Sequence, residues 1–144
     1  MLKIFRKLPM SDANLDFYKY PSWTEHDGFS YCGNSFLCAR LIKQPEKISQ
    51  VISYLNNELD RPDEHCYILA WLEACEHGVK HVYNFALQDT DFGQVIRTCC
   101  PLSFLWSQRE RMIFLRKWWK FRDNGIAMDV RINNMPKDGE LLIE

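Results

Sequence analysis

The sequence is poor in the residues that dominate disordered chains, and it has no long apolar run. Glycine and proline occur only six times each in 144 residues, whereas 47% of the residues are hydrophobic and 14% are aromatic. This composition excludes a low-complexity chain and favours a dense interior rich in aromatic side chains. No segment approaches the roughly 20 consecutive apolar residues that a membrane-spanning helix needs. We therefore expect no association with a membrane.

The signals of export and of a disulfide framework are also missing. The first eight residues mix Lys3, Arg6 and Lys7 with apolar side chains, so no apolar run follows the charges as it does in a secretory signal. The six cysteines lack the spacing of a small secreted scaffold, and we expect mostly reduced thiols in the core. These absences predict a cytoplasmic protein that forms one globular domain over residues 1–144.

The familiar catalytic signatures do not occur either. The chain has no glycine-rich phosphate loop, G-x-S-x-G elbow, H-E-x-x-H zinc motif or calcium loop. His26 and Asp27 are neighbours ahead of Gly28 and could form an acid–base pair, but such a dipeptide in a turn is usually solvated. We therefore predict a protein that is not an enzyme and that carries no cofactor.

Cysteine and histidine provide the nearest approach to a metal or redox site. Cys75, His77 and His81 carry suitable zinc ligands, but we expect Gly78 to end the helix that would bring the two imidazoles together. Cys99-Cys100 could form a strained redox pair, although a buried Cys99 beside a half-exposed Cys100 fits the pattern better. No metal site is predicted.

The middle of the chain has the spacing of helices. Apolar residues recur at intervals of three and four, separated by capping residues, glycine and proline. The clearest start is the S-x-x-E capping box of Ser107 and Glu110. The five predicted helices cover residues 45–59, 60–78, 79–87, 90–100 and 107–122. The segment 79–87 also fits a strand, and Asp89 or Thr90 can cap the helix that follows it.

The two ends of the chain follow other patterns. After Gly125, apolar and polar residues alternate from Ile126 to Asn133, which predicts a strand. The turn pair Asp138-Gly139 followed by residues 141–143 would complete a C-terminal β-hairpin. Residues 1–43 show no clean period, and we expect an irregular segment of short strands or turns, in which residues 35–43 fit either a strand or a turn of helix. The predicted fold class is mainly α within α+β, a bundle of about five helices with this hairpin.

Charge is balanced overall, at a formal −1, but unevenly distributed. Asp60, Asp63 and Glu64 crowd the junction of two predicted helices, where a basic protein surface would be attracted to them. Exposed aromatic residues such as Tyr18 and Trp23 could anchor the same interface. These five residues are the predicted partner-binding site. The function predicted from this elimination is a non-enzymatic cytosolic binding protein that inhibits a macromolecular partner by occlusion, for example an immunity protein that neutralises a bacterial toxin.

The alternative is a small nucleic-acid-binding or regulatory module that uses the basic aromatic helix 109–122. Projected at about 100° per residue, basic residues occupy one side of this helix and aromatic residues the other. Stacking of bases on aromatic rings together with phosphate contacts is the chemistry of single-strand binding. The predicted nucleic-acid-binding residues are Arg109, Arg116, Lys117 and Lys120.

Overall fold

The computed structural model describes residues 23–59 and 65–141, and every regular element within these ranges is helical. The described ranges hold seven α-helices and two short 3-10 turns. In chain order they are α2 (Glu25–Lys43), η2 (Pro45–Lys47), α3 (Ile48–Glu58), α4 (His65–Glu76), α5 (Val79–Ala86), α6 (Asp91–Thr98), η3 (Ser103–Leu105), α7 (Gln108–Asp123) and α8 (Met128–Asn134). The described part of the chain is therefore all-α, and the predicted α+β class is wrong. None of its helices is both long and apolar enough to cross a bilayer.

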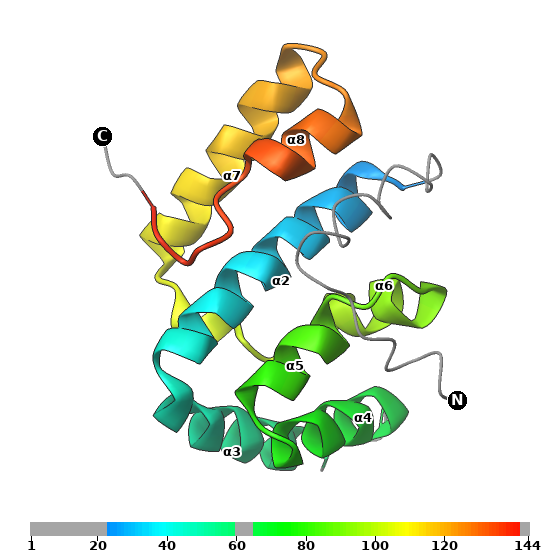
Figure 1. Ribbon diagram of the computed structural model, residues 1–144, viewed down its shortest axis with the longest axis vertical. Helices are drawn as coiled ribbons and strands as arrows, with labels where there is room; N and C mark the ends of the chain where they lie inside the picture. The colour runs from blue at the N-terminus through cyan, green and yellow to red at the C-terminus, as the bar shows by residue number, and fades with distance from the viewer. Residues whose placement is uncertain (1–22, 60–64, 142–144) are drawn as a thin grey trace.

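Helix α2 runs through the middle of the molecule (Figure 1). Helices α3, α4 and α5 lie together at one end of the view, and α7 and α8 lie side by side at the other. Helix α2 contacts α5 and α6 on one side and α7 and α8 on the other. The two groups of helices thus share α2 as a common core element.

The position of α2 explains why its helical character is hidden in the sequence. Ten of its 19 residues are buried, including Cys32, Phe36 and Leu41 at 0% exposure. A helix covered on most sides has no wet face, so its apolar residues show no clear period. The expectation of an irregular segment with short strands or turns is therefore wrong for residues 25–34, and residues 35–43 follow the helical one of their two alternatives. Residues 1–22 lie outside the described residues.

The predicted strand after Gly125 is also helical. Helix α8 buries Ile132 at 1% exposure and Arg131 at 9%, while Val130 is 45% exposed. The alternation of apolar residues is thus not an alternation of buried residues. The burial of the Arg131 guanidinium is compensated because its Nη1 donates to both carboxylate oxygens of Glu25 at 2.6 Å and its Nε donates to the carbonyl of Ile126 at 2.6 Å.

The turn predicted at Asp138-Gly139 exists, but it closes no hairpin. The backbone N–H of Glu140 donates to Asp138 Oδ1 at 3.0 Å, and Gly139 has φ of 80°. The carbonyl of Gly139 accepts from Arg40 in α2 instead of from a neighbouring strand. The C-terminal hairpin is therefore wrong. Of the second strand's residues 141–143, only residue 141 is described, and it belongs to no regular element.

The predicted helices in the middle of the chain are confirmed where the structure describes them. Thr90 Oγ1 caps α6 by accepting from the Gly93 N–H at 2.9 Å, and Ser107 with Glu110 forms the predicted capping box of α7. Gly78 at φ 97° and Gly125 at φ 69° follow α4 and α7 as left-handed stops. Local capping chemistry was sufficient to place these helix ends.

Candidate binding groove along helix α7

A groove of 1390 Å³ runs between the outer face of α7 and residues 134–141. It is larger than the roughly 300–1,000 Å³ of a typical small-molecule site. Because the buried Phe114 and Trp118 hold the inner face of α7 against the core, the outer face is left for the groove. From α7 the lining residues are Arg109, Met112, Ile113, Arg116, Lys117, Lys120 and Phe121.

All four residues of the predicted nucleic-acid-binding set line this one wall. Arg109, Arg116 and Lys120 fall within about 40° of each other around the helix axis, with Lys117 beside them. None of the four forms an ion pair with another residue in the described ranges. Since no described carboxylate neutralises them, this wall of the groove is positively charged.

The opposite wall carries the other sign. Asp138 and Glu140 line it, from the segment that follows α8. Glu140 pairs with Lys43 at 3.0 Å, but their side chains are 70% and 48% exposed, so water screens this pair strongly. The groove therefore has one cationic wall and one wall with two carboxylates.

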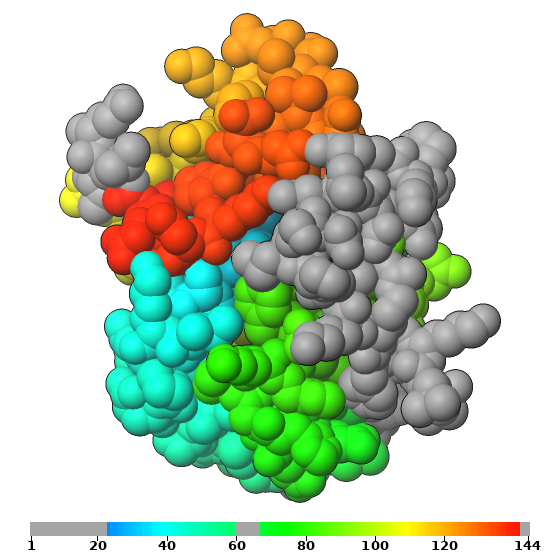
Figure 2. Space-filling model, viewed as in Figure 1, coloured from blue at the N-terminus to red at the C-terminus, as the bar shows by residue number. Residues whose placement is uncertain are grey.

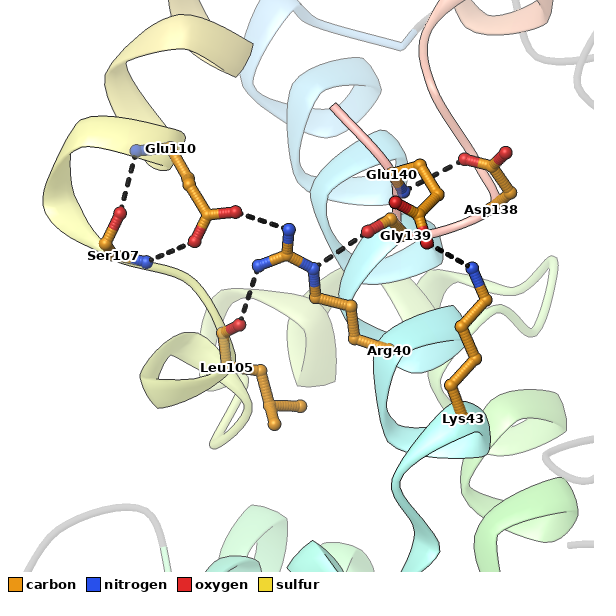
Figure 3. Close-up of polar contacts among 8 residues, drawn as sticks. All are labelled: Arg40, Lys43, Leu105, Ser107, Glu110, Asp138, Gly139 and Glu140. Carbon is orange, nitrogen blue, oxygen red and sulfur yellow. Dashed lines mark hydrogen bonds and ion pairs between the residues drawn. The ribbon is translucent and has the colours of Figure 1, made fainter. Parts of the chain in front are cut away.

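Arg40 of α2 connects the two walls (Figure 3). Its Nε donates to the carbonyl of Gly139 at 2.9 Å, and its Nη1 donates to the carbonyl of Leu105 at 2.9 Å. Its Nη2 forms an ion pair with Glu110 in the first turn of α7. The space-filling view shows the C-terminal segment, in red, lying against the cyan part of α2 (Figure 2). One guanidinium thus positions the start of α7 and the turn that faces it.

The carboxylate of Glu110 both caps α7 and forms the ion pair with Arg40. Its Oε1 accepts from the Ser107 N–H at 3.0 Å in the capping box, while Oε2 meets Arg40. The hydrogen bond from Arg40 and that from the Ser107 N–H lower the pKa of Glu110 to about 2. The carboxylate is therefore ionised at all physiological pH values.

The remaining groove lining is mainly aliphatic. Met112 and Ile113 from α7 are joined by Ile126 and Leu141, and Phe121 is the one aromatic side chain among the described residues that line the groove. Phe121 and Leu141 also pack against the hydrophobic core. This floor offers apolar contact but little ring area for stacking.

The two tryptophans of α7 do not line the groove. Trp118 is 2% exposed, and its Nε1 donates to Glu25 Oε2 at 3.1 Å. Trp119 is 38% exposed, and the guanidinium of Arg122 lies 5.9 Å from its ring centroid. The two tryptophans therefore lie apart from the four basic residues, as the helical projection indicates.

The first predicted site falls mostly on residues that the structure does not describe. Asp60, Asp63, Glu64 and Tyr18 lie outside the described ranges, so their role stays a prediction. Trp23 is described, and it is only 7% exposed. Its ring lies 5.8 Å from the ring of Tyr31 and 5.8 Å from the guanidinium of Arg97. The structure thus places Trp23 in the core instead of on an open surface.

The cysteine and histidine candidates also have definite positions. Gly78 does end α4, yet the rings of His77 and His81 stay 4.9 Å apart across the junction. The expectation that a helix break separates them is wrong. Burial and the neighbouring His77 lower the pKa of His81. Among the described residues, no group of three or more His, Cys, Asp or Glu side chains is arranged to hold a metal ion.

The buried thiols are in their neutral form. Burial raises the pKa of Cys32 to about 12 and that of Cys75 to about 11. Because the thiolate is the nucleophile, these two sulfur atoms are poorly reactive at neutral pH. Cys99 and Cys100 are both half-buried, so the predicted contrast between them is wrong.

The pair His26 and Asp27 belongs to a helix start. Asp27 accepts from the Thr24 N–H at 3.1 Å, and Thr24 Oγ1 accepts from the Asp27 N–H at 3.2 Å. His26 is exposed in the first turn of α2. The carboxylate of Asp27 therefore caps a helix and does not orient the neighbouring imidazole.

Sequence reasoning missed Arg40, the residue that organises the groove. Its partners lie 65, 70 and 99 residues further along the chain. No local pattern distinguishes it from an ordinary basic residue near the end of a helix. Comparisons with protein-family models, curated proteins and solved structures give no match to this chain.

Proposed function

We propose that this chain is a non-enzymatic binding protein that occludes a macromolecular partner, with the groove along α7 as its contact surface. The observation that carries the proposal is the set of four cations without ion-pair partners among the described residues, aligned beside an aliphatic floor. Exposed charges at the rim of an apolar patch favour the encounter and orientation of a partner. An immunity protein that covers a toxin is one example of such a mechanism.

The acidic residues predicted first remain a separate proposal. Asp60, Asp63 and Glu64 would attract a basic partner surface, in contrast to the cationic wall of the groove. A chain with both surfaces can contact a partner of mixed charge. The groove is the better supported of the two because the structure describes its residues.

The proposal is tested by the complex that the protein forms in its native host. The double variant Arg116→Glu with Lys117→Glu reverses two of the four cations and so neutralises the cationic wall, whereas Arg111→Glu reverses one charge on the opposite side of α7. We expect co-purification at low salt to retain a stable complex for wild type and Arg111→Glu and to lose it for the double variant. A complex that survives the double variant would remove the groove from the proposed function.

A nucleic-acid-binding module is the second candidate, favoured by the same four cations. It predicts an affinity that falls steeply with salt, because each neutralised phosphate releases counterions. Anisotropy titrations of a labelled oligonucleotide at several salt concentrations measure this slope. A flat response would eliminate the candidate.

A further inference from the structure

We propose that the groove along α7 receives an amphipathic helix of a partner protein, with acidic side chains along one edge and basic side chains along the other. This inference rests on the binding function proposed above and names the chemistry of its partner. It follows from three properties of the groove: the opposite charge of its walls, its aliphatic floor and its size.

The charges of the two walls require an occupant with two different edges. Arg109, Arg116 and Lys120 attract carboxylates along one edge, while Asp138 and Glu140 on the other wall attract cations. An amphipathic helix can present a row of Glu or Asp to α7 and a row of Lys to the facing segment. A uniform polyanion satisfies only one wall and is repelled by the other.

The floor calls for aliphatic side chains between these rows. Met112, Ile113 and Leu141 offer contact to leucine-like anchors at the spacing of one helical face. Unstacked bases, in contrast, bind through aromatic platforms, and Phe121 is the only such ring that the described part of the chain brings to the groove. The floor therefore favours a protein segment over a single-stranded nucleic acid.

The length and shape of the groove suit a helix. Its lining extends from Arg109 to Asn124, which corresponds to roughly 22 Å of helix rise. The described residues contain no strand, so they present no sheet edge to which an extended peptide could add. Packing of a helix into an elongated, mainly aliphatic groove is the peptide-binding mode that this lining fits, since polyproline segments bind aromatic-lined grooves.

The test uses a designed peptide because the natural partner is unidentified. The labelled peptide has 16 residues, the length of α7, with one row of Glu, a central stripe of Leu and an opposite row of Lys. A scrambled peptide of the same composition is the first control, and a single-stranded oligo-dT of 16 nucleotides is the second. Fluorescence anisotropy at low salt gives the Kd of each for wild type and variants.

We expect the amphipathic peptide to bind at least about tenfold more tightly than the scrambled one. The double variant Arg116→Glu with Lys117→Glu should lose about tenfold or more in affinity, whereas Arg111→Glu should stay within about twofold. Circular dichroism melting establishes that the variants fold; the three substituted side chains form no ion pair with another described residue.

The substitution Asp138→Asn distinguishes peptide binding from nucleic-acid binding, because it should change the two affinities in opposite directions. The amide oxygen can still accept from the Glu140 N–H, but the negative charge is gone. Binding of the peptide should weaken by about two- to fivefold because its Lys row loses a partner, whereas binding of a polyanion would strengthen.

Three results would overturn the inference. The first is equal binding of the scrambled and the amphipathic peptides. The second is tighter binding of oligo-dT than of the peptide, strengthened further by Asp138→Asn. The third is self-association of the protein that the double variant abolishes, which would make a second copy the occupant. If the double variant binds the peptide as tightly as wild type but no longer forms the native complex, this inference alone is contradicted. If the double variant retains both the peptide and the native complex, the proposed function is contradicted as well.

Discussion

Replacing Arg40 with methionine should destabilise the protein far more than the same replacement of Lys43, one turn away on α2. Arg40 donates to two backbone carbonyls, pairs with Glu110 and lies 4.6 Å from the centroid of the Phe36 ring. Its side chain is 19% exposed. Lys43 makes one ion pair, with Glu140, and both of those side chains are largely exposed. The two substitutions thus compare a partly buried hub with a surface pair in the same region.

The expected magnitudes follow from these contacts. Hydrogen bonds to a charged group contribute about 1.5–3 kcal/mol each, and the carbonyls released by Arg40→Met regain some contact with water. We therefore expect a loss of about 2–4 kcal/mol in the free energy of unfolding. Lys43→Met should cost less than about 1 kcal/mol. For a chain of this size, the Arg40 change corresponds to a fall in Tm of roughly 6–15 °C.

Urea denaturation followed by circular dichroism measures both values. The midpoint should shift for Arg40→Met without a change in slope, because the amount of surface exposed on unfolding stays the same. A double-mutant cycle with Glu110→Gln isolates the ion pair, and its coupling energy should vanish as Glu110 becomes protonated in acid. If Arg40→Met and Lys43→Met differ by less than about 0.5 kcal/mol, Arg40 is not the hub that we describe.

Gly139, the Glu110 carboxylate and the buried thiols of Cys32 and Cys75 should each respond measurably to a perturbation. Gly139→Ala should lower the Tm more than Gly125→Ala does. Both glycines have positive φ, but a Cβ at Gly139 would lie 2.9 Å from Arg40 Cγ, whereas a Cβ at Gly125 would lie in open space. Equal Tm values for the two variants would refute this close approach. The free energy of unfolding should fall as pH drops through 4.5 toward 2, because the pKa of Glu110 is about 2 in the folded protein and near 4.5 when unfolded. In acid titration, the Glu110→Gln variant should lose less stability over this range than the wild type. An identical profile for the two proteins would contradict this. Cys32 and Cys75 should react with a thiol reagent at neutral pH only as fast as the protein opens, so labelling of these sites that is rapid under native conditions and insensitive to stabilising ligands or osmolytes would contradict their burial.

The helices between residues 45 and 123 were predictable because each is amphipathic or has clear capping residues. Thr90 and Ser107 signal their helix starts within three residues of sequence, and Gly125 signals an end. The structure confirms these positions because caps act locally. The acidic junction at residues 60–64 lies outside the described residues, so the helix start predicted there stays a prediction.

Helices α2 and α8 were not predictable for the opposite reason. Their character depends on neighbours that arrive from distant parts of the chain. Gly28 illustrates this, since a Cβ there would lie 2.4 Å from Met128 Sδ of α8. Without the fold, that glycine looks like a turn residue. The alternation of apolar and polar residues around Val130 likewise resembles a strand. That Arg131 is buried depends on its contact with Glu25, a residue far away in the sequence, so the local pattern does not reveal it.

The candidate groove shows the same division. Its cationic wall was predictable, because Arg109, Arg116, Lys117 and Lys120 follow one helix at helical spacing. The facing wall was not, because residues 134–141 were interpreted as a hairpin. The bond from Arg40 to Gly139 spans 99 residues, and no local pattern encodes it.

Helix α2 holds α7 at two separate points, and this has a consequence for the energetics of recognition. Arg40 near the end of α2 contacts Glu110, and Glu25 near its beginning accepts from Trp118, about 12 Å further along α7. A helix held at both points has little freedom to rotate or slide. The backbone that bears the cations is thus preorganised before any ligand arrives, so most of the entropy lost on association would be that of the incoming segment and of the four long side chains.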